Sequence, residues 1–280
     1  MDKSRLSLMT FPMAFDLWKR KMSIKDTLAV AGQAGIPCVD VMHVRKNQID
    51  AYTSAMRQTG VQVYTYMITT SFLRNKWKWE NDIRKGLKTA SALGAKYLMI
   101  VPYDFLNRSK AMKLGRDAVK QCMIAGFRKA VELAKDSDIS VCFETTPHDL
   151  SCLSGTEDCL DVLNAVPGLQ FVFDTANMLP HGDDPVEAYE KLKGRISHVH
   201  LKDVILTAKG QNRGYAEIAA DGRQMQVVVW GEGIIPVREL YDQMITDGYT
   251  GYFAIEYVHP DGGACGVEMH TKQLDRFFRN

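Results

Sequence analysis

Residues 119–144 read VKQCMIAGFRKAVELAKDSDISVCFE and contain, in order, the two kinds of element from which the rest of the chain is built. The first part has an apolar residue at every fourth position, which places these residues on one face of a helix: Val119, Met123, Phe127 and Val131. Residues 140–144 form a short apolar run that ends in a carboxylate, Glu144. Such runs are typical of buried parallel strands. The stretch therefore predicts a helix followed by a parallel strand.

The same pairing of apolar run and amphipathic stretch recurs along the chain. The predicted strands are Leu6–Phe11, Cys38–Met42, Val61–Ile68, Tyr97–Pro102, Ser140–Glu144, Gln170–Asp174, Ile196–Leu201 and Tyr252–Glu256. Several predicted helices end in glycine, as at Gly60 and Gly94, where a left-handed residue stops a helix. Eight alternating units predict a (β/α)8 barrel of the TIM type. An open doubly wound sheet is the alternative, and the first strand lacks the GxGxxG turn typical of it.

Length and composition support one α/β domain over residues 1–280, since a barrel of this class needs about 250 residues. The net charge of +2 argues against a nucleic-acid partner. No apolar stretch approaches the roughly 18 residues of a membrane span, and the N-terminus lacks a signal peptide. The six cysteines form no CxxC pair. We expect a reduced cytoplasmic protein with a small-molecule partner and no membrane partner, and association into a homo-oligomer stays open.

The ends of the last four predicted strands carry residues of the metal-ligand type. Active sites of such barrels form at the carboxyl ends of the strands. Three of these strands end in Glu144, Asp174 and Glu256, and His200 is the next-to-last residue of the other. A buried charge is costly when unpaired, and for any one of these residues a salt bridge or a helix cap is an equal explanation. Four in succession, with no Lys or Arg ending any of these strands, predict a bound divalent cation.

The donor set also restricts the cation. Three oxygen donors and one nitrogen donor suit Mn²⁺ best, with Co²⁺ or Mg²⁺ as alternatives and Zn²⁺ less natural. Such an ion polarises a carbonyl and a neighbouring hydroxyl, and so acidifies the C–H bond between them. Side chains alternate along a strand, so an inward His200 predicts that Lys202 and His198 also point inward. His198 lies one layer deeper and is expected to be a core histidine.

Five motifs carry a resemblance that covers most of the chain and is strongest from residue 140 onward. They are Cys142-Phe143-Glu144, Phe173-Asp174-Thr175-Ala176-Asn177, residues 198–203 (HVHLKD), Gly231-Glu232-Gly233 and residues 248–256 (GYTGYFAIE). With them the chain resembles the xylose-isomerase-like barrel superfamily of sugar isomerases and epimerases, to which proteins like AP endonuclease family 2 also belong.

The resemblance implies one metal ion held by Glu144, Asp174, His200 and Glu256. Glu144 and Glu256 then also act as the acid and base on opposite sides of the substrate, through a metal-bound enediolate. The implied enzyme of carbohydrate metabolism is an isomerase, of the ketose 3-epimerase or hydroxypyruvate isomerase kind, acting on a ketose or related keto-polyol.

Residues near these ligands are candidates for substrate binding. His148 lies in the loop after Glu144, Asn177 follows Asp174 by three positions, and Lys202 has the inward parity. Asp203 is expected either to cap the following helix or to orient His200.

Two other enzyme classes of the superfamily share this ligand pattern in part. Related lyases dehydrate inososes or dehydroshikimate, or cleave oxidised glycosides, with the same metal set, so the sequence leaves isomerase and lyase open. An apurinic endonuclease is disfavoured, because its three-zinc site needs additional histidines after the second to fourth strands and this chain has only His43 there. A non-catalytic sugar-binding barrel would not require all four ligands.

Overall fold

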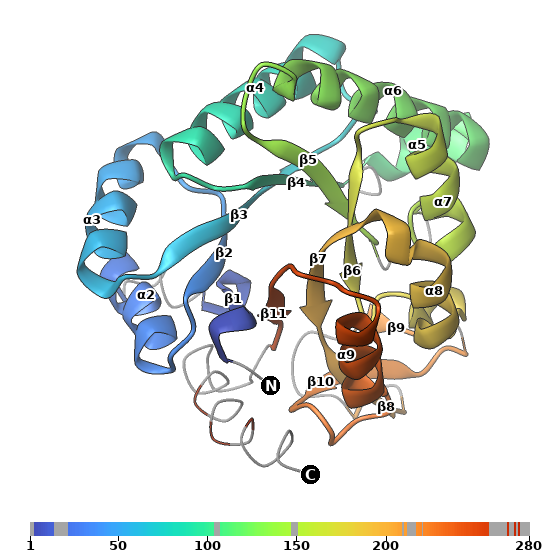
Figure 1. Ribbon diagram of the computed structural model, residues 1–280. Coiled ribbons are helices and arrows are strands. Elements are labelled where there is room, and N and C mark those ends of the chain that lie inside the picture. Colours follow the sequence, from blue (N-terminus) through green and yellow to red (C-terminus); the bar gives the residue numbers. More distant parts are fainter. Residues whose placement is uncertain are drawn as a thin grey trace.

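The computed structural model describes residues 3–13, 22–103, 107–146, 151–208, 210–211, 217–219 and 221–257, together with Glu268, Lys272 and Leu274. Parallel strands close into a barrel, and helices surround it (Figure 1). The barrel strands are β1 (Leu6–Met9), β2 (Cys38–Met42), β3 (Gln62–Thr70), β4 (Tyr97–Pro102), β5 (Ser140–Glu144), β6 (Gln170–Asp174), β7 (Ile196–Leu201) and β11 (Phe253–Ile255). Strand β1 pairs with both β2 and β11, which closes the sheet. The predicted barrel is thus confirmed, and the open-sheet alternative is wrong.

The helices alternate with the strands as the sequence pattern predicts. They are α2 (Ile24–Gln33), α3 (Ile49–Thr59), α4 (Lys76–Ala92), α5 (Arg108–Leu114), α6 (Arg116–Ala134), α7 (Thr156–Ala165), α8 (Pro185–Leu192) and α9 (Val237–Thr246), and the short 3-10 helices are Lys3–Arg5, Phe11–Met13, Lys46–Gln48, Leu179–His181 and Lys193–Arg195. Helix α3 ends at Gly60, whose φ of 74° is the predicted left-handed stop. Among the described residues, no helix has the length and apolar character needed to cross a bilayer.

The alternation of side chains along each strand divides the core into two layers. One layer, inside the barrel, includes Met9, Cys38, Tyr64, Met99, Cys142 and Val172. The other, between strands and helices, includes Phe143, Phe171, Phe173 and Phe253. On β5, Phe143 packs against Phe127 of α6 with ring centroids 5.1 Å apart. Its neighbours Cys142 and Glu144 therefore face the interior, and Glu144 does so at the carboxyl end of the strand.

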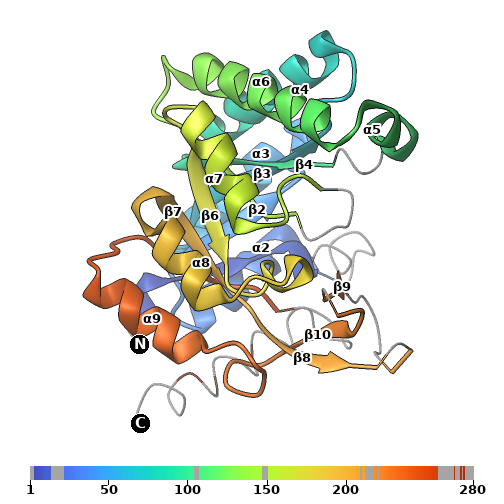
Figure 2. The same ribbon diagram turned by 90° about the vertical axis from the view of Figure 1, so that its right-hand side faces the viewer.

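A small antiparallel sheet follows the seventh barrel strand and was not among the predicted elements. It consists of β8 (Asp203–Thr207), β10 (Gln224–Val228) and β9 (Glu217–Ile218), in the spatial order β8-β10-β9. Strand β8 begins two residues after β7 ends, so the sheet extends from the barrel's carboxyl end (Figure 2). Its position brings residues from an insertion close to the site described below.

Candidate metal centre

Four side chains from four adjacent strands meet at the carboxyl end of the barrel. Glu144 ends β5, Asp174 ends β6, His200 lies one residue before the end of β7, and Glu256 directly follows β11. One ligand atom from each residue lies within 4.8 Å of the corresponding atoms of the other three. The strands are neighbours in the order β11-β7-β6-β5, so closure of the barrel brings these residues together.

The backbone after β6 sets the orientation of Asp174. Its Oδ1 accepts hydrogen bonds from the amides of Ala176 and Asn177, at 2.8 and 3.0 Å. The Thr175 hydroxyl donates to the Lys202 carbonyl at 2.7 Å and accepts from the Lys202 amide at 2.9 Å, which ties the end of β6 to that of β7. One carboxylate oxygen of Asp174 is therefore held by the chain, and Oδ2 is left for the centre.

The ligand atoms converge without forming ordinary hydrogen-bonded pairs. The Nδ1 atom of the fully buried His200 lies 2.7 Å from Glu144 Oε1 and 3.0 Å from Glu256 Oε2. An imidazole nitrogen carries at most one hydrogen, so it cannot donate to both. Neither contact has the direction of a hydrogen bond, and the three atoms have no hydrogen-bond partner among the described residues. Oxygen and nitrogen donors that face one point in this way fit a divalent cation.

No lysine ends any of the four strands, but Lys202, predicted to point inward, lies among these acids. Lys202 comes one residue after β7, and its side chain is only 4% exposed. Its Nζ lies 3.0 Å from Asp174 Oδ2 and 3.2 Å from Glu256 Oε1. A further carboxylate, that of Glu217, lies 3.9 Å away. One lysine faces four carboxylates, Glu144 included, so it reduces the negative charge of the centre without cancelling it.

The pKa shifts at the centre reflect this excess of negative charge. Burial alone would lower the pKa of His200, but Glu144 and Glu256 outweigh it and raise that pKa well above its ordinary value. Burial, with neighbouring carboxylates, also raises the pKa of Asp174 well above its usual range. For Glu256, burial is outweighed by Lys202 and His200, which lower its pKa. A histidine ligand must be neutral, so we expect a bound cation to displace the proton that His200 otherwise attracts.

A buried aspartate–histidine pair lies one layer below the candidate ligands. His198 Nε2 lies 2.9 Å from Asp40 Oδ2, and His198 Nδ1 lies 3.1 Å from the carbonyl oxygen of Tyr252. The hydroxyl of Ser7 donates to the same Asp40 oxygen at 2.9 Å. Both ring nitrogens of His198 thus have partners, and the prediction of a core histidine is confirmed.

Asp203 has neither of its two expected roles. Its carboxylate accepts hydrogen bonds from the amides of Gly231, Gly233, Ile235 and Val204, at 2.8–3.0 Å. It therefore holds the Gly231–Gly233 turn against the start of β8. A Cβ atom on Gly233 would lie 2.0 Å from Asp203 Oδ1, so the turn requires glycine there. The link joins two of the sequence motifs, residues 198–203 and Gly231-Glu232-Gly233, in space.

Of the three predicted substrate-binding residues, the structure describes Lys202 and Asn177. Lys202 reaches the centre, as its parity predicts. Asn177 is buried, its Nδ2 lies 3.5 Å from the Thr145 carbonyl oxygen, and its Oδ1 has no hydrogen-bond partner among the described residues. His148 lies outside the described residues. Glu217 was not predicted, because it belongs to the inserted sheet and does not end a barrel strand.

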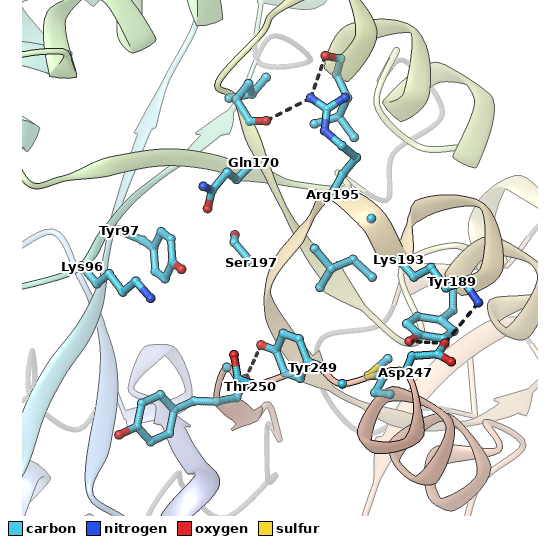
Figure 3. A pocket seen from close by; sticks show the side chains of 18 of the residues that line it. Lys96, Tyr97, Gln170, Tyr189, Lys193, Arg195, Ser197, Asp247, Tyr249 and Thr250 are labelled. Atoms are coloured by element: carbon cyan, nitrogen blue, oxygen red, sulfur yellow. Dashed lines mark hydrogen bonds and ion pairs between the residues drawn. The ribbon is translucent and has the colours of Figure 1, made fainter.

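A cavity with a volume of about 1090 Å³ lies at the opposite, amino end of the barrel (Figure 3). Its polar side chains are mostly bonded to each other or to the backbone. Arg195 donates to the carbonyls of Leu163 and Leu169, and Asp247 contacts Tyr189 and Lys193. The carboxyl end is therefore the candidate site, because its buried donor atoms converge without hydrogen-bond partners among the described residues.

Residues 28–276 match the family model described as the xylose isomerase-like TIM barrel. The chain belongs to this family. Among curated proteins, an inosose dehydratase from Clostridium tetani is 26% identical over 154 residues, which are 52% of this chain and 50% of that protein. The matches to curated inosose dehydratases span only about a third to a half of their length.

Solved structures share the fold over the whole length. The probable 3-DHS dehydratase AsbF from Bacillus anthracis superposes with a TM-score of 0.74 at 17% identity, and covers 99% of this chain and 100% of that one. The IOLI protein, solved with a bound zinc atom, has a TM-score of 0.72 at 14% identity, with 97% of each chain covered. At such identities the likeness shows the fold.

Proposed function

We propose that this protein is a divalent-metal-dependent enzyme that removes the proton next to the carbonyl of a keto-sugar or keto-polyol. The observation that carries the proposal is the pair Glu144 and Glu256, whose carboxylates approach His200 Nδ1 to 2.7 and 3.0 Å. The two glutamates and Asp174 offer three oxygen donors, and His200 offers one nitrogen donor. A cation held by them would polarise the substrate carbonyl and acidify the neighbouring C–H bond.

The chain's own residues would move the proton. Glu144 and Glu256 are the bases, and a positioned proton-transfer group accelerates such a step by about 10²–10⁴-fold. Contact with Lys202 and His200 lowers the pKa of Glu256 despite its burial, so this carboxylate carries no proton of its own at neutral pH. The buried ammonium of Lys202 lies beside Glu256 and would stabilise negative charge that develops on the substrate oxygen.

The fate of the resulting enolate decides the reaction class. We favour loss of a hydroxyl group as water, and an inosose as the class of substrate, because the matched curated relatives are named inosose dehydratases. Isomerisation or epimerisation is the second candidate, because two glutamates that face one point suit removal of a proton by one and its return by the other. Manganese is the proposed ion. Cytoplasmic location stays a prediction.

The reaction is tested by incubating the protein with Mn²⁺ and an inosose, and separately with unphosphorylated ketoses, in deuterated water. We expect deuterium to enter the carbon next to the carbonyl, with loss of 18 mass units if water leaves. Deuterium without mass loss would identify an isomerase or epimerase. A protein that catalyses neither exchange nor mass loss on any of these substrates would contradict the proposed function.

A further inference from the structure

The inserted sheet brings one carboxylate, Glu217, to the metal centre from outside the barrel. Glu217 lies on β9, which pairs only with β10 among the described strands. Its Oε2 lies 3.9 Å from Nζ of Lys202, the lysine that also contacts Asp174 and Glu256. The inserted sheet therefore places a chemical group beside the site.

The alternation of the sheet shows that Glu217 faces inward. Its side chain is 14% exposed, whereas the next residue, Ile218, is 50% exposed. In the antiparallel pairing Glu217 lies opposite Met225, which is 2% exposed. Directly opposed residues point to the same face of a sheet. The strand thus directs the carboxylate to the centre and an isoleucine to solvent, the reverse of what solubility alone would favour.

Glu217 is close to the centre without belonging to the ligand set. The four mutually close ligand atoms come from Glu144, Asp174, His200 and Glu256. Glu217 contacts Lys202, which itself contacts Asp174 and Glu256, and at 3.9 Å the Lys202–Glu217 contact is longer than a hydrogen bond. Among the described residues no other side chain pairs with Glu217. A largely buried carboxylate needs a hydrogen-bond partner, and a hydroxyl of a bound polyol would supply one.

We propose that Glu217 is the acid that protonates the leaving hydroxyl of a keto-polyol. This inference rests on the proposed function and extends it. In the first step Glu144 or Glu256 takes the proton next to the carbonyl, and the C–H electron pair forms the enolate. Glu217 starts the cycle as the carboxylic acid. In the second step those electrons form the new C=C bond, the C–O bond at the next carbon breaks, and Glu217 gives its proton to the departing oxygen. Water leaves, and proton exchange with solvent restores both carboxyl groups.

If Glu217 acts only in the second step, its replacement should slow dehydration without slowing proton exchange. Glu217→Gln keeps the size of the side chain and removes the acid, so we expect dehydration of an inosose to fall by about 10²–10⁴-fold. Exchange of the proton next to the carbonyl with deuterated solvent should stay within about threefold of wild type, with the Mn²⁺ content unchanged. Ile218→Gln, a change of the neighbouring outward residue, is the matched control and should alter neither rate.

Other outcomes overturn the inference. If Glu217→Gln lowers exchange and dehydration equally, Glu217 acts by positioning Lys202 or the sheet. If neither rate falls, Glu217 has no part in the reaction. A wild-type protein that exchanges the proton but never loses water would refute the role of Glu217 while leaving the proposed function standing, whereas absence of exchange would refute the proposed function itself.

Discussion

The two ends of the barrel differ in how their polar groups find partners. At the amino end, the cavity is large, but Arg195 is bonded to two carbonyls and Asp247 to Tyr189 and Lys193 (Figure 3). One side-chain atom at this end differs from the others: the buried Oε1 of Gln170 has no hydrogen-bond partner among the described residues. At the carboxyl end, the four ligand residues each leave a buried atom without such a partner. Buried polar groups that lack partners need a ligand or an explanation.

The first and largest expected difference between the ends concerns turnover. Glu256→Gln removes a base and a ligand charge, so kcat should fall by about 10²–10⁴-fold, and the bound metal content should fall too. The matched change at the amino end is Asp247→Asn, which alters partly exposed contacts to Tyr189 and Lys193. Its turnover should stay within about twofold of wild type. Steady-state kinetics and elemental analysis measure both variants, and equal losses in the two would show that the ends do not differ in function.

The layer between the two ends provides a test by pH. Burial would raise the pKa of Asp40, but His198 outweighs it and lowers that pKa below its ordinary value of 3.8. A lowered folded-state pKa contributes stability above pH 3.8 that is lost as the pH falls through the folded pKa. Breaking a buried pair costs about 3–5 kcal/mol. Asp40→Asn should lose this much free energy of unfolding at pH 6 and less at pH 3.

Chemical denaturation at the two pH values measures the Asp40 effect. Ser7→Ala is the control, because it removes one hydrogen bond to Asp40 but keeps the contact between Asp40 and His198. A loss in Asp40→Asn that is the same at pH 3 and pH 6 would contradict a charged pair.

Removal of the cation should affect only the carboxyl end. A chelator should abolish turnover, and added Mn²⁺ or Co²⁺ should restore it. A ligand at 100 times its Kd stabilises the folded state by about 2.7 kcal/mol, so the melting temperature should rise on adding metal. Glu256→Gln should lose most of this rise, and Asp247→Asn should keep it. Differential scanning calorimetry with and without metal makes the comparison, and full activity after chelation would remove the metal centre from the proposal.

The smallest expected effect separates two glycines at the two ends. A Cβ on Gly233 would lie 2.0 Å from Asp203 Oδ1 and 2.5 Å from the Val204 carbonyl oxygen, whereas one on Gly194, beside the amino-end cavity, would meet nothing within 4 Å. Gly233→Ala should therefore cost about 1–3 kcal/mol of unfolding free energy. Gly194→Ala should be neutral in thermal denaturation. Equal stabilities would show that the Asp203 turn adapts freely.

Much of the barrel was predictable because its signals are local. Each barrel strand is an apolar run whose ends in the structure lie within two residues of the predicted ones. The ligand types at residues 144, 174, 200 and 256 could also be predicted, since every parallel strand of a closed barrel ends at the same rim. The alternation of side chains along the strand likewise predicted that Lys202 points inward, but it did not predict the contacts of Lys202 with Asp174 and Glu256.

Other features depended on which residues come close in space. The inserted sheet has strands of two to five residues with a mixed burial pattern, so its sequence lacks a clear period. Other contacts join segments that are distant in the chain. They are the contact of Glu217 with Lys202, the pairing of Asp40 with His198, and the three hydrogen bonds that Asp203 accepts from the amides of residues 231, 233 and 235. By itself, the sequence determined the barrel and the types of ligand at its rim, because periodicity and strand ends are local properties. Only the tertiary structure decided which charges are paired, because partners are set by distances between strands and loops that no local pattern records.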